Sequence, residues 1–158
     1  MALKRLKTCI VALCAVLISA TGAQARDSLT IGISQFPSTF HPSIDSMMAK
    51  TYILSMARRP ITTTDADWNL VCVLCVELPT IENGLARPEK TPDGKDGVAI
   101  TYKLRDDIRW GDGTPVTTRD VLFTWEVGRH PKSGVGNAEA YRRILSIDIH
   151  DDYSFTLH

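Results

Sequence analysis

Residues 102–125 read YKLRDDIRWGDGTPVTTRDVLFTW, and this stretch decides the fold. Residues 102–104 have strand character, and the Trp-Gly-Asp-Gly run at 110–113 predicts a tight turn, because Gly and Asp tolerate backbone angles that other residues avoid. Thr117 should cap the helix that follows, and Asp120, three residues on, can complete a capping box. The stretch therefore predicts a rigid strand–turn–helix corner, which is a structural feature and not a catalytic site.

The same stretch resembles the signature of the family 5 extracellular solute-binding proteins, the peptide, dipeptide and nickel binding components of ABC importers. The structural motif that carries the resemblance comprises Trp110, Asp112, Gly113, Thr114, Pro115, Thr117 and Asp120, with Leu104, Arg105, Ile108, Arg109, Val116, Val121, Phe123 and Trp125 around it. Supporting matches lie at 36–42 and 78–84, and the resemblance covers residues 29–157. It departs at His41, where many members have Asp before the Pro.

The resemblance implies a mixed α/β fold of the periplasmic-binding-protein type II architecture. Such proteins have two lobes and several hundred residues, so we expect this chain to be the N-terminal part of one. Residues 1–25 would be the signal peptide, 26–60 the start of lobe one, and 61–158 a smaller β-rich subdomain that is truncated at its C-terminal end.

By the same resemblance, the protein is a substrate-binding component of an ABC import system and not an enzyme. It would be monomeric, capture a peptide or similar small solute in the periplasm and deliver it to the membrane permease, without a cofactor or metal. Two alternatives stay open, a secreted hydrolase and a complete small secreted β-rich domain. The hydrolase would need a nucleophile–base pair, and no G-x-S-x-G or P-loop motif occurs.

The N-terminus predicts export independently of the resemblance. Lys4, Arg5 and Lys7 form a positive n-region, 9–20 is a short apolar region, and Ala23-Gln24-Ala25 is an A-x-A cleavage site. The apolar run is short for a membrane-spanning helix, which needs about 20 residues. A lipid anchor at Cys14 is disfavoured by the bulky residue directly before it. We therefore expect a mature chain that begins at Arg26.

Charge excludes one class of partner. The chain has 18 Lys+Arg and 18 Asp+Glu. Removal of residues 1–25, which hold three of the bases and no acid, leaves 15 bases against 18 acids, a net charge of −3 with His neutral. With no basic stripe, the mature protein is not expected to bind nucleic acid.

The remaining elements follow from hydrophobic periodicity and from turn residues. Expected strands are 29–33, 61–64, 70–76 and 98–104, with 70–76 central in its sheet because it is apolar on both faces. A helix is expected over 43–57, loops over 36–42, 89–97 and 130–137, and a hairpin from 144–150 and 153–157.

Cys72 and Cys75 form a C-x-x-C pair in the mature chain. On a strand, residues three apart point to opposite faces, which disfavours a disulfide unless the chain bends. We therefore favour two buried thiols. A structural disulfide and a redox or metal pair remain as alternatives.

The candidate ligand-binding residues are Ser34, Gln35, Phe36 and Pro37. They follow the expected strand 29–33, and ligands of open α/β sheets bind beyond the carboxyl ends of strands. Gln35 has an amide that can pair with a peptide backbone, and Phe36 can line a pocket, whereas Phe40 is expected in the core.

Other polar and aromatic residues fit structural roles. The spacing of Asp93, Asp96, Asp106, Asp107 and Asp112 does not match an EF-hand, and turns explain these residues better. The four His residues, His41, His130, His150 and His158, lack metal-ligand spacing. Trp68, Trp110 and Trp125 are each expected to pack in the core or between subdomains.

The export interpretation gives a direct test. Cleavage after Ala25 should give a product whose N-terminal sequence begins at Arg26, measured by Edman degradation or mass spectrometry of the exported protein. A different first residue, or a lipid on Cys14, would contradict it.

Overall fold

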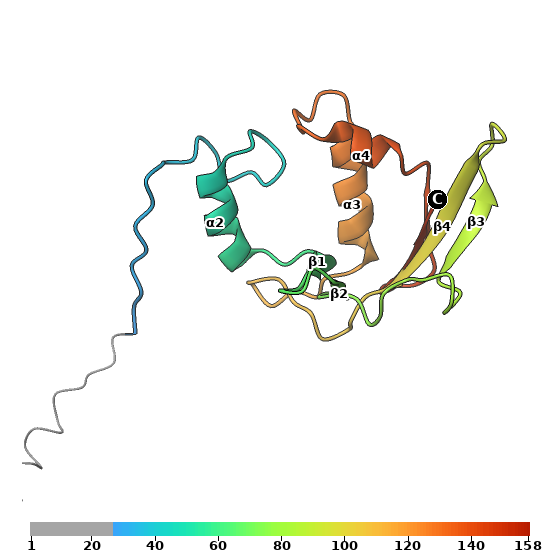
Figure 1. Cartoon of the computed structure of the whole chain (residues 1–158), viewed down its shortest axis with the longest axis horizontal. Helices are drawn as coiled ribbons and strands as arrows, with labels where there is room; N and C mark the ends of the chain where they lie inside the picture. Colours follow the sequence, from blue (N-terminus) through green and yellow to red (C-terminus); the bar gives the residue numbers. More distant parts are fainter. Residues whose placement is uncertain (1–26) are drawn as a thin grey trace, which may run out of the picture. The chain divides into compact units, whose positions relative to one another are not determined.

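The structure, a computed structural model, describes residues 27–158, so the expected signal peptide and its cleavage site lie outside the described residues. The chain divides into two units between Ser34 and Gln35. All the helices and strands described below belong to the unit 35–158 (Figure 1).

The strand expected at 29–33 is absent, and that prediction is wrong. Residues 27–33 have no regular structure, and Leu29, Ile31 and Ile33 are 84%, 51% and 41% exposed. A strand requires a neighbour that accepts its backbone hydrogen bonds. None of the strands described in 35–158 pairs with this segment.

Helix α2 spans Met48–Ala57 and begins later than the expected 43–57. The delay has a backbone cause, because Asp45 has φ 55°, a left-handed conformation that a helix cannot contain. The predicted end is confirmed: the Arg58 N–H donates to Leu54 O at 2.7 Å, and Arg58 itself is extended.

Strands β1 (Thr62–Thr64) and β2 (Leu70–Cys72) pair antiparallel as a separate two-stranded sheet. The expectation of a long central strand over 70–76 is therefore wrong. Val73 and Leu74 both donate their N–H groups to Ile61 O, at 2.9 and 3.2 Å, which bends the chain away from β1. Beyond the bend, Cys75 forms an isolated bridge with Leu104.

The bend also overturns the favoured interpretation of the cysteine pair. Cys72 and Cys75 are joined by a disulfide, with their Cα atoms 5.2 Å apart. Because β2 ends at Cys72, the two Cβ vectors no longer diverge as they would on a continuous strand. The structure therefore has the structural disulfide, which the sequence left open as an alternative to two buried thiols.

The main sheet has four antiparallel strands in the order β3-β4-β6-β5. They span Ala86–Lys90 (β3), Asp96–Lys103 (β4), Ile147–Ile149 (β5) and Ser154–Leu157 (β6). The expected hairpin is present as β5 and β6, and β3 and β4 form a second hairpin that extends into the loop expected at 89–97. Strand β3 was not expected because it contains Pro88, which is tolerated here because β3 is an edge strand.

The register of the sheet gathers apolar side chains on one face. Ile100, Leu157 and Ile147 form one cross-strand row, and Tyr102, Phe155 and Ile149 form the next. The Tyr102 and Phe155 rings stack with centroids 5.7 Å apart, and Phe155 is 1% exposed. The other face is polar, and there the hydroxyls of Thr101 and Thr156 lie 2.8 Å apart.

Helix α3 (Thr118–Arg129) is the expected capped helix, and α4 (Ala138–Arg142) is a short helix that the sequence did not predict. The two lie close together: a Cβ on Gly128 would overlap the Tyr141 ring, so this position of α3 requires glycine. The Trp125 indole N–H lies 3.1 Å from Tyr141 O and 3.2 Å from Ile144 O.

The tryptophans differ in their environments. The packing role expected of Trp125 is confirmed by its hydrogen bonds to the segment after α3. Trp68 and Trp110 are 85% and 52% exposed, so neither packs in a core within residues 27–158, and the expected alternative of packing between subdomains stays a prediction. Trp68 has φ 66° at the tip between β1 and β2, and Trp110 begins the turn that Gly113 closes.

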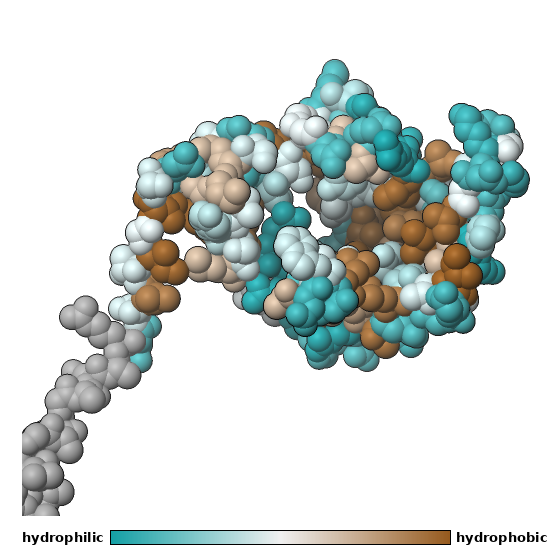
Figure 2. Space-filling model, viewed as in Figure 1, coloured by the Kyte–Doolittle hydropathy of each residue, from teal (hydrophilic) through white to brown (hydrophobic). Residues whose placement is uncertain are grey.

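Much apolar surface remains exposed in the unit 35–158. Figure 2 shows it gathered in the hollowed region between α3 and the sheet. Val98 and Ile149, on the apolar face of the sheet, are 44% and 43% exposed. Within residues 27–158, none of the helices has the length and apolar character needed to span a membrane.

The disulfide should stabilise the fold measurably. Cys72→Ala breaks it while leaving the buried Cys75 in place, and should lower the free energy of unfolding by about 2 kcal/mol, the chain-entropy value for a short closed loop. Urea denaturation with and without dithiothreitol measures this. The reductant should destabilise the natural sequence and leave Cys72→Ala unchanged. Two free thiols in the exported, unreduced protein would contradict the disulfide.

Candidate functional site

The candidate ligand residues lie at the boundary of the two units. Ser34 ends the first unit, and Gln35, Phe36 and Pro37 begin the second. Gln35 is exposed, Phe36 is 86% exposed, and Pro37 is buried. Within 35–158, the structure thus presents an amide and an aromatic ring to the surface beside a buried proline. Phe40 is 55% exposed, so its expected place in the core is wrong.

The segment 38–45 that follows is built from local side-chain contacts. The Ser38 hydroxyl donates to the Asp45 carboxylate. The His41 N–H donates to Thr39 Oγ1 at 3.1 Å, and the Ser43 N–H donates to His41 Nδ1 at 3.3 Å. Serine, threonine, aspartate and histidine here replace the backbone pairing that a helix or strand would provide.

Sequence reasoning missed Lys50, which organises this segment from α2. Lys50 is 3% exposed, and its ammonium donates to the carbonyl oxygens of His41, Ile44 and Asp45. One signal was available in the sequence, because Lys50 is the one charged residue in the helix sequence MAKTYILSMA. An exposed lysine is the usual expectation, so the signal was not used.

The turn of the structural motif has the expected geometry. The Trp110 N–H donates to Thr114 O at 2.8 Å, and Gly113, with φ 89°, donates to Trp110 O at 2.9 Å. Asp112 Oδ1 accepts the Thr114 N–H at 2.9 Å and its hydroxyl at 2.7 Å. The backbone N–H of Thr114 is the main cause of the lowered pKa of Asp112. These bonds are all internal to the turn, which fits a structural role.

The capping box expected at the start of α3 is confirmed. Asp120 Oδ2 accepts the Thr117 N–H at 2.8 Å. Thr118, 1% exposed, then fixes the helix to the turn between β5 and β6: its N–H donates to Asp152 O and its hydroxyl to Asp151 O, both at 2.9 Å. The corner is thus bound to the sheet through backbone carbonyls.

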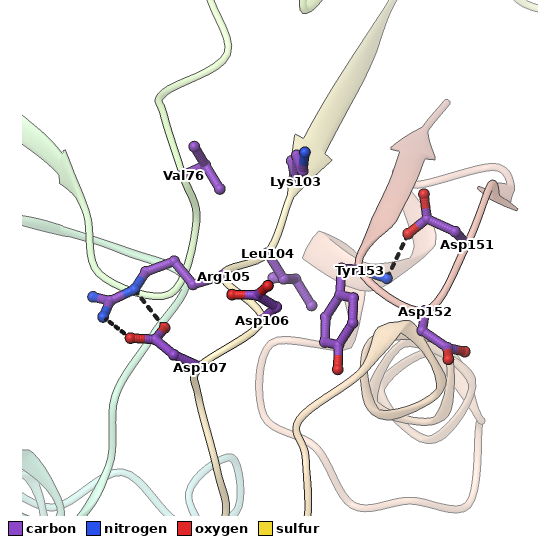
Figure 3. A pocket seen from close by; sticks show the side chains of 9 residues that line it. All are labelled: Val76, Lys103, Leu104, Arg105, Asp106, Asp107, Asp151, Asp152 and Tyr153. Carbon is purple, nitrogen blue, oxygen red and sulfur yellow. Dashed lines mark hydrogen bonds and ion pairs between the residues drawn. The ribbon is translucent and has the colours of Figure 1, made fainter.

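An open hollow of about 830 Å³ lies beside this junction (Figure 3). Its lining is Val76, Lys103, Leu104, Arg105, Asp106, Asp107, Asp151, Asp152 and Tyr153. Arg105 and Asp107 pair at 2.6 Å, and the hydrogen bond from Arg105 lowers the pKa of Asp107. None of the candidate ligand residues, Ser34 to Pro37, lines this hollow.

A hydroxyl–imidazole pair bears on the hydrolase alternative. His150 Nε2 lies 2.8 Å from Thr156 Oγ1. Thr156 is 4% exposed on the polar face of the sheet and also contacts the Thr101 hydroxyl. A nucleophile must reach its substrate, so this pair fits sheet packing and does not support a hydrolase. Residues 27–158 contain no group of three or more His, Cys, Asp or Glu side chains that could hold a metal ion.

Comparison with known proteins shows the family. The family model described as bacterial extracellular solute-binding proteins, family 5 Middle, matches residues 80–158, which include β3 to β6 and the whole strand–turn–helix corner. The chain belongs to this family. Its fold is the mixed α/β fold of the periplasmic-binding-protein type II class, as the resemblance implied.

Three relatives illustrate the similarity. The probable D,D-dipeptide-binding periplasmic protein DdpA of Escherichia coli K12 is 33% identical over 142 residues, covering 87% of this chain and 25% of that protein. The oligopeptide binding protein of Thermus thermophilus, solved with a pentapeptide, is 33% identical with a TM-score of 0.65, covering 73% of this chain and 19% of that chain. NikZ of Campylobacter jejuni, solved with Ni(L-His), shares the fold at 19% identity, with a TM-score of 0.59 over 78% of this chain and 22% of that chain.

The matched region is a small part of these relatives. The chain spans 25% of the E. coli protein and 19% of the Thermus chain. The comparisons show the family and the fold of these residues. They do not extend to the ligand or the partners of a whole binding protein, which are proposed below.

The anchoring role of Thr118 can be tested by an isosteric change. Thr118→Val removes the hydroxyl that donates to Asp151 O in a buried setting and should lower the free energy of unfolding by about 1–2 kcal/mol. Thr124→Val is the matched control, because the Thr124 hydroxyl also donates to a backbone carbonyl of α3 but is exposed. Chemical denaturation of both variants measures the difference. Equal losses would contradict a special role for Thr118.

Proposed function

We propose that this chain belongs to the solute-binding component of an ABC importer, which captures peptides or a similar small solute and delivers them to a membrane permease. The observation that carries the proposal is the corner 102–125, built as the sequence predicts and lying within the family match. Two relatives favour a peptide ligand: DdpA is named for dipeptide binding, and the Thermus protein was solved with a pentapeptide.

The proposed organisation follows the resemblance. Residues 26–60 would open lobe one, and 61–158 would form most of a smaller subdomain. The ligand would be held in a cleft by backbone hydrogen bonds, as when a peptide adds to a strand, and closure of the lobes would be favoured by ligand contacts made in the closed state. The component would be monomeric, would work without catalysis or cofactor, and would act in the periplasm.

Gln35 and Phe36 are the side chains that we propose contact the ligand. Their exposure leaves both free to do so: Phe36 is 86% exposed, and the Gln35 side chain is exposed as well. The Gln35 amide can donate to and accept from a peptide backbone, and Phe36 can cover an apolar side chain. The buried Pro37 fixes the chain direction directly after them.

The placement of the site can be tested on the exported product of the gene. Gln35→Ala and Phe36→Ala should each weaken peptide binding by about 1–2 kcal/mol, the range of a lost hydrogen bond or partial contact, measured by isothermal titration calorimetry with a panel of di-, tri- and pentapeptides. Phe123→Ala is the matched control, because Phe123 is also an exposed phenylalanine, 65% exposed on α3.

The outcomes separate the ligand class from the site. If no peptide of the panel binds the natural sequence, the peptide assignment is wrong. If peptides bind but Gln35→Ala and Phe36→Ala leave the affinity at the level of Phe123→Ala, then the ligand contacts lie elsewhere.

A further inference from the structure

Among residues 27–158, Lys50 is the charged residue that the fold buries most completely. It is 3% exposed, and its ammonium has three hydrogen bonds, to His41 O at 3.0 Å and to Ile44 O and Asp45 O. Across residues 27–158, none of the ion pairs involves Lys50. An ammonium has three donors, so the three carbonyl oxygens use its full capacity.

A charge buried without a counter-ion is costly unless its hydrogen bonds replace the lost water. Here that replacement depends on the conformation of the segment 41–45, because this conformation turns the carbonyl groups of His41, Ile44 and Asp45 toward the Lys50 ammonium. The three carbonyl oxygens thus form a site for a cation, and the Lys50 ammonium occupies it. Desolvation of Lys50 therefore disfavours every loop conformation in which the carbonyls point away.

The segment 41–45, which supplies the three carbonyl groups, is connected to the candidate ligand segment and to a second loop. Asp45, held in its left-handed conformation, accepts the Ser38 hydroxyl and so fixes the chain just after Pro37. The Ser43 carbonyl accepts the Gly136 N–H at 2.9 Å, which joins the segment to the loop between α3 and α4. Lys50 thus holds the segment 38–45 from one side while the loop 130–137 contacts it from another.

We propose that Lys50 is a positioning residue that fixes the segment 38–45 and thereby presents Gln35 and Phe36 to the ligand. The second half of this statement rests on the proposed function. Lys50 itself does not touch the ligand, because its side chain is buried and its three donors are used within the loop.

Hydrogen exchange tests the first half without any ligand. In Lys50→Met, which keeps an unbranched side chain one atom shorter and removes its charge, the amides of His41, Ser43 and Gly136 should exchange at least tenfold faster. Amides of the main sheet, such as Thr101 in β4, should keep their rates. Lys132→Met is the matched control, because Lys132 is exposed and its change should alter none of these amides. Unchanged exchange in Lys50→Met would overturn the proposal.

Chemical rescue distinguishes positioning by the ammonium from general packing. Lys50→Ala removes a group equivalent to propylammonium, so added propylammonium should restore slow exchange at His41 and Ser43, whereas propan-1-ol at equal concentration should not. If both additives act equally, Lys50 is a packing residue and the proposal is wrong. The same conclusion holds if the loop and sheet amides lose their protection from exchange together and propylammonium does not restore it.

Calorimetry with the peptide panel tests the link to the ligand in the exported product. Lys50→Met should weaken binding at least fivefold, and Lys132→Met should not. Faster loop exchange with unchanged affinity, in a protein whose Gln35→Ala variant binds weakly, would overturn the link. If the natural sequence binds no peptide, the proposed function fails, and the exchange and rescue experiments decide the positioning role alone.

Discussion

Backbone hydrogen bonds at the carboxyl end of β4 hold together the parts of the unit 35–158 that are distant in sequence. The Leu104 N–H donates to Tyr153 O at 2.7 Å, and Arg105 N–H donates to Leu74 O at 2.9 Å. Leu104 is 2% exposed between these two segments. Because Thr118 binds the carbonyls of Asp151 and Asp152, the helix after the corner returns to the turn that Leu104 contacts. The two sheets and α3 therefore depend on one junction.

The family signature lies between the two ends of this junction, and that position explains its residue types. Between Leu104 and Thr118 the chain must reverse its direction within a few residues. The Arg109–Pro115 bridge, the Gly113 turn and the Asp112 side chain accomplish this reversal, and the capping box then starts the helix in the right place. A pattern set by such a geometric requirement identifies a fold well, and it carries no information about the ligand.

Features that depend on neighbours in sequence could be predicted. The Asp112 turn, the Thr117–Asp120 capping box and the hairpin around Asp151 all form from residues a few positions apart, and all are present. Predictions failed where the outcome depended on distant backbone. The strand expected at 70–76 ends early because the Val73 and Leu74 N–H groups both donate to Ile61 O, which bends the chain. The same bend allows Cys72 and Cys75 to form a disulfide.

The candidate site shows the same limit more sharply. The exposure of Phe36 and the burial of Pro37 could not be read from an apolar, proline-containing segment, because such a segment fits a core and a surface loop equally. The role of Lys50 was hidden because its partners are carbonyl groups, which every residue has. Only the conformation of residues 41–45 makes these carbonyls converge.

Ligand choice within this family must then be carried outside the corner. The Thermus protein holds a pentapeptide and NikZ holds Ni(L-His), yet both superpose on this chain, with TM-scores of 0.65 and 0.59. Since fold similarity does not fix a ligand, selectivity has to come from side chains that the fold leaves free. Gln35 and Phe36 are the side chains that we propose for this role, because both are exposed and neither takes part in the junction at Leu104. Because the proposed role of Lys50 concerns residues 38–45, which follow Gln35 and Phe36, these two residues can vary while the fixed segment keeps its geometry. Such an arrangement would separate the evolution of binding from the stability of the fold.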